Sequence, residues 1–133
     1  MKKPGLALPD TNAVLRYLLR DHETHYGIAN EFFEAVREGS RQALLLEGVL
    51  VECVHVLTKF YKVPRPEAAQ QLRGLLQYKG IRNPNRQELL DAFTRYGESK
   101  LDIVDCMLLA ASAARQLELF SFDVHLRSSP PSE

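Results

Sequence analysis

The stretch that decides the fold is Leu6-Ala7-Leu8-Pro9-Asp10-Thr11-Asn12, a short apolar run that ends at an acid and leads into a helical pattern. An apolar run of this length, followed directly by a helix, predicts a buried β-strand. Asp10 would then lie at the carboxyl end of the strand, where open α/β sheets place their ligands. Thr11 and Asn12 suit the turn, because short polar side chains can bond the free N–H groups at a helix start. Asp10 is therefore either the first acid of a metal site or simply the cap of the helix that follows.

Length and charge limit the classes of protein that fit. A chain of 133 residues forms one domain and can bury roughly two-thirds of its unfolded surface. The 17 basic and 17 acidic residues cancel, so a polyanion such as nucleic acid would need a local basic patch. Candidates for such a patch are Arg16, Arg20, Lys59, Lys62, Arg65, Arg82, Arg86 and Lys100. Their spacing does not bring them together, and scattered, solvated charges fit it equally well.

Cysteine usage and the chain ends indicate a cytoplasmic protein. Cys53 and Cys106 each lie within an apolar helical pattern, and we expect reduced thiols in the core rather than a disulfide. The first residues lead into an apolar run too short for a signal peptide, and no stretch approaches the roughly 18 apolar residues of a membrane span. We expect a single domain over residues 1–126 and a disordered Ser/Pro-rich tail over residues 127–133.

The middle of the chain offers a second strand and a second acid. The apolar run 42–46 has the length of a strand, although its leucines also suit a helix. Residues 49–59 then read as a helix, with Glu52 beside its apolar face. A carboxylate in that position costs stability unless it is paired or binds a cation, so Glu52 is a candidate ligand. The alternative is an ordinary solvated glutamate.

Histidines give weaker signals. His22 and His25 could reach one metal ion, but no Cys or third His lies nearby, and a solvated helix start fits them better. His55 has no partner at a clear spacing and is expected to be packed or exposed.

The last third of the chain adds three more acids. Asp102 lies at a predicted helix start, where an acid is favourable in its own right. Asp105 follows on the same helix face, so the two charges repel each other, and a divalent cation would offset that repulsion. The run 117–123 repeats the opening pattern, since a predicted apolar strand ends at Asp123.

Acids therefore follow strand ends or occupy the opening turns of helices along the whole chain. Helices between the strands make parallel, right-handed crossovers the default, which would bring these positions to one edge of a sheet. Clustered carboxylates without Cys or His companions favour Mg²⁺ or Mn²⁺. Such an ion, bound also to a phosphate, supports hydrolysis of a phosphodiester bond.

The same residues resemble a known family. The segments Asp10-Thr11-Asn12, Val49 to Leu57, Leu101 to Asp105 before an alanine-rich helix, and Phe120-Ser121-Phe122-Asp123 are similar to the four acidic blocks of PIN-domain nucleases. Within that family the resemblance is to the VapC-type toxins of bacterial toxin–antitoxin pairs. It extends from about Leu6 to Leu126, with the four blocks in the family's order.

The resemblance implies a three-layer α/β/α sandwich around a central, mostly parallel sheet of four to five strands. It also implies an endoribonuclease dependent on Mg²⁺ or Mn²⁺, a homodimer, and inhibition by a VapB-type antitoxin whose tail reaches the acidic pocket. The residues that match the family's metal-binding and catalytic acids are Asp10, Glu52 and Asp105, with Asp123 as the variable fourth. Asp102 matches an acid found in part of the family. Thr11, Asn12 and Ser121 would support the acids, with Ser121 in place of the usual threonine.

Other classes fit the residues less well. A haloacid-dehalogenase-type phosphatase needs a second acid two positions after the first, where this chain has Asn12. A response-regulator receiver needs an acidic pair after its first strand and a lysine after its last one. A non-catalytic PIN-like module that binds RNA or protein is the remaining alternative, and the loss of an acid that would signal it is not seen.

Overall fold

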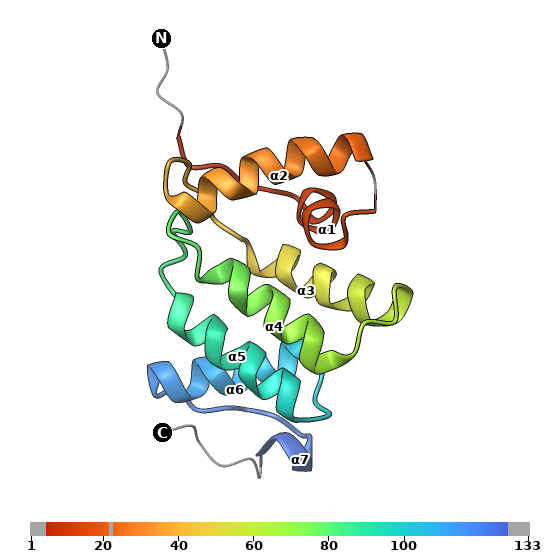
Figure 1. The fold of residues 1–133 in the computed structure, drawn as a ribbon. Coiled ribbons are helices and arrows are strands. Elements are labelled where there is room, and N and C mark those ends of the chain that lie inside the picture. The colour runs from red at the N-terminus through yellow and green to blue at the C-terminus, as the bar shows by residue number, and fades with distance from the viewer. Residues whose placement is uncertain (1–4, 22, 128–133) are drawn as a thin grey trace.

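The structure is a computed structural model, which describes residues 5–21 and 23–127 (Figure 1). Helices make up most of this part of the chain. They are α1 (Thr11–Leu19), α2 (Glu23–Glu38), α3 (Glu47–His55), the π-helical turn η1 (Val56–Phe60), α4 (Arg65–Leu76), α5 (Arg86–Glu98), α6 (Ile103–Arg115) and the short α7 (Val124–Arg127). The helix predicted over residues 49–59 is confirmed to within a few residues, as α3 followed by η1.

Three extended segments run parallel to one another before α1, α3 and α5. Ala43 forms parallel bridges with Ala7 on one side and with Ile81 on the other. Backbone N–H groups of Ala7 and Leu44 donate across the first bridge, at 2.9 and 3.0 Å, and those of Ala43 and Arg82 across the second, at 2.9 and 2.8 Å. Because the segments are parallel, the chain leaves all three bridges toward the same end.

The predicted sheet is wrong. In the described parts of the chain the pairing stops at these isolated bridges, so there is no sheet of four to five strands and no three-layer sandwich around one. The residues that follow each bridge explain the early stop. Pro9 and Pro84 lack the N–H group that a further ladder bond requires. The segment of Ala43 continues as leucines, which favour strands less than β-branched residues do, and α3 begins at Glu47.

The strand predicted over residues 117–123 is also wrong. This segment forms no bridge to any other described residue and runs as irregular chain from α6 to α7. Phe120 and Phe122 pack edge to face with centroids 5.5 Å apart, yet their side chains are 81% and 86% exposed. The apolar residues of this segment predict a strand, but both aromatic rings face solvent.

Asn83 extends the second bridge with its side chain. Its amide oxygen accepts from the backbone N–H of Leu45 at 2.9 Å, and its Nδ2 donates to the carbonyl of Leu45 at 2.7 Å. The buried amide thus substitutes for one more backbone pair. This contact fixes the chain just before α3, the helix that carries Glu52.

The core lies between successive helices, which stack from α1 and α2 at one end of the molecule to α7 at the other (Figure 1). α1 packs on α2, α4 on α5 and α5 on α6, while α3 contacts α1, α4 and α6. Phe33, Leu50, Leu72 and Phe93 are among the largest side chains that are fully buried. α3 is therefore the central helix, and its Glu52 contacts Thr11 at the start of α1.

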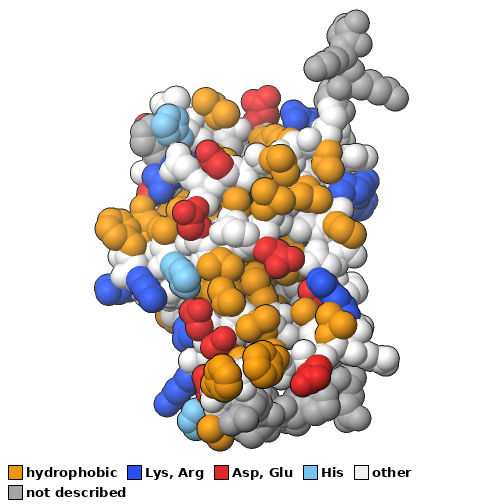
Figure 2. Space-filling view, turned by 180° about the vertical axis from the view of Figure 1, so that it is seen from behind, with side chains coloured by type: hydrophobic (Ala, Val, Ile, Leu, Met, Phe, Trp, Pro, Cys, Tyr) orange, Lys and Arg blue, Asp and Glu red, His pale blue; other side chains and the backbone are white. Residues whose placement is uncertain are grey.

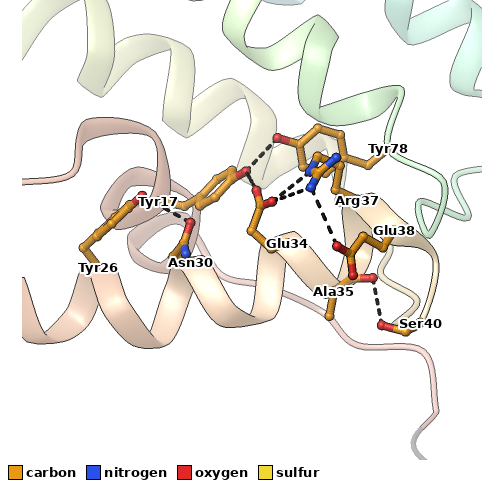
Figure 3. A network of polar contacts seen from close by, with 9 residues as sticks. All are labelled: Tyr17, Tyr26, Asn30, Glu34, Ala35, Arg37, Glu38, Ser40 and Tyr78. Carbon is orange, nitrogen blue, oxygen red and sulfur yellow. Dashed lines mark hydrogen bonds and ion pairs between the residues drawn. The ribbon is translucent and has the colours of Figure 1, made fainter.

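A polar network joins α1, α2 and the turn after α4 (Figure 3). The Tyr17 hydroxyl donates to Glu34 at 2.8 Å and lies 2.7 Å from the Tyr78 hydroxyl. Arg37 forms an ion pair with Glu34 at 2.7 Å. Burial first, and then the bonds to Tyr78 and Glu34, raise the pKa of Tyr17 far above its ordinary value. The network anchors α1, the helix that Asp10 caps and that begins at Thr11.

Two predictions lie outside the described residues, namely the role of His22 and the disorder of the tail beyond residue 127. Within the described ranges, no helix combines the length and apolar character needed to cross a membrane.

Candidate metal and nuclease site

Asp10 and Glu52 are brought together around Thr11. Asp10 precedes α1 and caps it, because its Oδ1 accepts the backbone N–H of Ala13 at 2.8 Å. Thr11, the next residue, donates its hydroxyl to Oε1 of Glu52 on α3. The capping role considered from the sequence is thus real, and it leaves Oδ2 of Asp10 outside the capping bond.

The charges of Asp10 and Glu52 both act on the buried thiol of Cys53. Burial, together with the negative charges of Glu52 and then Asp10, raises the pKa of the Cys53 thiol to about 12. Cys106 is buried as well, and burial raises the pKa of its thiol. Both cysteines are unpaired thiols that stay protonated, so neither is a ready metal ligand.

A second group of acids surrounds Asp105 on α6. Burial, and then the charges of Asp102 and Asp123, raise the pKa of Asp105. Asp123 is held in place by its surroundings, since its Oδ1 accepts the backbone N–H of His125 at 2.9 Å. Ser121 accepts the N–H of Asp123 at 3.0 Å, so the predicted supporting residue does fix the loop of this acid. Asn12, in contrast, lies exposed in the first turn of α1.

The sequence gives His55 no partner, but in the structure it contacts Asp102. Its Nε2 lies 3.4 Å from Oδ1 of Asp102, although the two residues are far apart in the chain. Asp102 occupies the capping position of α6 but forms no capping bond with its side chain. No spacing rule could have found this pair, because it depends on how α3 packs against α6.

The two groups of acids do not merge into one ligand set. Among the described residues, no three His, Cys, Asp or Glu side chains converge closely enough to hold a metal ion. The chemistry of the donors nevertheless fits a hard cation, since all five candidates are carboxylates and the nearby thiols are protonated. α3 contacts both α1 and α6, so the two groups lie on adjoining elements.

The basic residues suggested for RNA binding have largely structural roles. Arg65 lies 3.7 Å from the ring centroid of Tyr96 and donates to the carbonyl oxygens of Tyr96 and Leu101. Arg82 and Arg86 donate to backbone carbonyls near Ile81. The exposed cations that remain are Arg20, Lys59, Lys62 and Lys100. On the face shown in Figure 2, acidic side chains lie among hydrophobic ones, and Lys and Arg lie toward the edges.

Comparison with known proteins identifies the family. The PIN domain family matches the chain over residues 7–129. No curated protein and no solved structure matched it. The matched range includes every acid described above and nearly the whole chain. The chain therefore belongs to the PIN domain family, whose members are generally nucleases that typically use divalent metals.

Proposed function

We propose that this chain is an endoribonuclease that hydrolyses phosphodiester bonds of RNA with Mg²⁺ or Mn²⁺. Asp10, Glu52, Asp105 and Asp123 are the proposed catalytic and metal-binding acids, with Asp102 beside them. The observation that carries the proposal is that α3, which bears Glu52, packs against both α1, capped by Asp10, and α6, which bears Asp105. A metal ion bound there would supply an activated water and neutralise the phosphoryl oxygens.

The chain's own contacts orient these carboxylates. Thr11 holds Oε1 of Glu52, and the capping bond to Ala13 holds Oδ1 of Asp10. The backbone N–H of His125 holds Oδ1 of Asp123. Each of these acids thus has one oxygen engaged by the protein, which fixes the direction of the other oxygen.

Substitution of single acids tests the proposal. Glu52→Gln and Asp105→Asn should each abolish metal-dependent cleavage and reduce the stabilisation that Mg²⁺ or Mn²⁺ gives to thermal unfolding. Glu67→Gln is the matched control, because Glu67 is an exposed acid at the start of α4, away from both groups. Full cleavage by Glu52→Gln would refute the assignment of that residue.

A non-catalytic PIN-like binding module is the second candidate. It is favoured by one observation, that no three acids converge in the described residues. The same experiment separates the two functions. A module would bind RNA or a protein and show no cleavage with either metal, and the acid substitutions would leave that binding largely unchanged.

We further propose that the biological role is that of a toxin, held inactive by a VapB-type antitoxin whose tail reaches the acids. The similarity of the four acidic blocks to VapC-type toxins supports this role. Expression without the antitoxin should arrest growth, and Glu52→Gln should remove the arrest. Harmless expression of an enzyme that is active in vitro would point instead to a role in RNA processing.

A homodimer is part of the same proposal. A groove of about 300 Å³ between α3 and α6 is lined by Val51, Val104, Met107 and Leu108, among other residues. Val104 and Leu108 are 44% and 45% exposed, so a second copy could bury both side chains. Leu108→Asp should shift a dimer to monomers in sedimentation experiments. A wild-type protein that sediments as a monomer would contradict the proposal.

A further inference from the structure

A pocket of about 460 Å³ lies between α1, α2 and the segment of Ala7. Its volume is within the range of small-molecule sites. Its apolar lining includes Leu8, Pro9, Ile28, Ala29, Phe32 and Phe33. Phe32 and Phe33 pack edge to face with centroids 5.0 Å apart, so aromatic rings form part of the lining. The pocket suits a flat, largely apolar group.

The pocket adjoins the acids of the candidate site. Asp10 and Asn12 line it together with the apolar residues. Since Oδ1 of Asp10 is engaged by the start of α1, a group in this pocket would lie beside a carboxylate of fixed direction. Asn12 offers an amide next to it, which can donate to and accept from the edge of a base. Asp10 would therefore belong both to the pocket and to the proposed metal site.

One arginine lines the pocket, and a second lies near one of its aromatic rings. Arg16 lines it and forms an ion pair with Asp21 at 2.8 Å, but its buried Nε finds no partner among residues 5–21 and 23–127. The guanidinium of Arg41 lies 5.0 Å from the ring centroid of Phe32. Arg41 has no ion pair within the described chain, and its buried Nε also lacks a partner there. An apolar pocket that is lined by one guanidinium, with a second one near the ring of Phe32, complements a nucleotide, which joins a flat ring to an anionic phosphate.

We propose that this pocket accepts one unstacked base of the RNA substrate, next to the phosphate that is cleaved. The inference rests on the proposed nuclease function and adds a position at which the enzyme senses its substrate. Bases in single-stranded RNA can be splayed out into protein pockets of this kind. The pocket would then contribute to the choice of cleavage site, while the acids perform the reaction.

A set of short RNAs made from one cleaved sequence tests the proposal, each RNA lacking the base at one position. For the wild-type protein, kcat/KM should fall at least about fivefold when the RNA lacks the base next to the cleaved bond. Removal of a base at any other position should lower kcat/KM less. Affinity for the same RNAs is measured by fluorescence anisotropy in chelator. This second readout does not depend on cleavage.

Two variants block the pocket without changing the acids. Ile28→Asp places a charge at its mouth, where Ile28 is 67% exposed and the fold should tolerate the change. Ala29→Leu fills the buried wall instead. Phe60→Asp is the matched control, because Phe60 is 74% exposed on η1 and does not line the pocket.

The expected result is an interaction between protein and substrate changes. Ile28→Asp should lower the affinity and the kcat/KM for the intact RNA about as much as loss of the base does. It should have little further effect on either quantity for the RNA that lacks that base. Phe60→Asp should respond to base removal as the wild type does. If Ile28→Asp weakens every RNA equally, or if base removal has no effect at any position, the pocket is not a base site. If no RNA is cleaved but affinity still falls when the base at one particular position is missing, the proposed nuclease function is refuted and the base site is retained.

Discussion

The hydroxyl of Thr11 donates to Oε1 of Glu52, and this bond joins two acidic blocks that lie 41 residues apart in the chain. It links the first turn of α1 to the middle of α3. Thr11 also follows Asp10 directly, so one residue ties the cap of α1 to the acid of α3. The proposed site therefore depends on the packing of these two helices.

Replacing Thr11 tests this dependence. Thr11→Val keeps the shape of the side chain and removes the donor, so Glu52 loses the bond that orients it. We expect cleavage activity to fall by roughly 10- to 100-fold, as is typical when a partner of a ligand is removed. Thr11→Ser, which keeps the hydroxyl, should retain most of the activity. Equal activity of the two variants, measured as kcat/KM, would show that the bond has no part in catalysis.

Asn83 should be a main determinant of stability. Asn83→Ala removes both hydrogen bonds to Leu45. The buried backbone N–H and carbonyl of Leu45 then have no partner. We expect a loss of about 2–4 kcal/mol in the free energy of unfolding, since each buried unsatisfied group costs roughly 1–3 kcal/mol. Urea denaturation measures this change. Asn85→Ala, which removes only an exposed bond to Glu47, should cost much less.

Two glycines should respond to alanine in opposite ways. A Cβ at Gly80 would lie 2.0 Å from the carbonyl oxygen of Arg41 and 2.8 Å from that of Val36. Gly80→Ala should therefore destabilise the protein by about 1–3 kcal/mol or more. Gly74 lies within α4 with open space around it, and Gly74→Ala should stabilise by about 0.5–1 kcal/mol. Thermal unfolding of both variants checks the pair, and a stable Gly80→Ala would contradict the close approach of these segments.

Alkaline pH should destabilise the protein through Tyr17. Its pKa is raised in the folded protein above the ordinary value of 10.0, so the unfolded chain loses this proton first. Stability is therefore complete below about pH 10 and falls above it, by about 1.4 kcal/mol per pH unit for one proton. Tyr17→Phe should be less stable at pH 7 but show a weaker fall above pH 10. Tyr26→Phe is the control, since its hydroxyl bonds only Asn30 within α2. An identical alkaline fall in Tyr17→Phe and the wild type would exclude Tyr17 as the cause.

Helix positions could be predicted from the sequence, and strand pairing could not. The apolar pattern predicts a helix after Asp10 and another over residues 49–59, because one face of each must be buried, and α1 and α3 lie at these positions. The run 42–46 and the run 117–123 look alike as apolar segments, yet only the first forms bridges. Pairing depends on partners elsewhere in the chain, and Asn83 shows that a side chain can replace a strand residue.

The sequence suggests which residues form the proposed site but not how they are arranged. The acids are candidates because each follows an apolar run or lies in an early turn of a helix, and Thr11 and Ser121 form hydrogen bonds with Glu52 and with the backbone of Asp123. Their separation into two groups could not be foreseen, because it depends on how far α6 lies from α1 across α3. The contact between His55 and Asp102 arises from the same packing.

The most direct test of the central claim is cleavage of a pool of structured RNAs with Mg²⁺, with Mn²⁺ and with chelator, by the wild type and by Asp10→Asn. Asparagine caps helices about as well as aspartate does, so this variant should fold normally. Asp10→Ala, which also loses the cap, should lose about 1 kcal/mol of stability. We expect metal-dependent cleavage by the wild type and none by Asp10→Asn. Cleavage in chelator, or full activity of folded Asp10→Asn, would contradict a metal-dependent nuclease built on these acids.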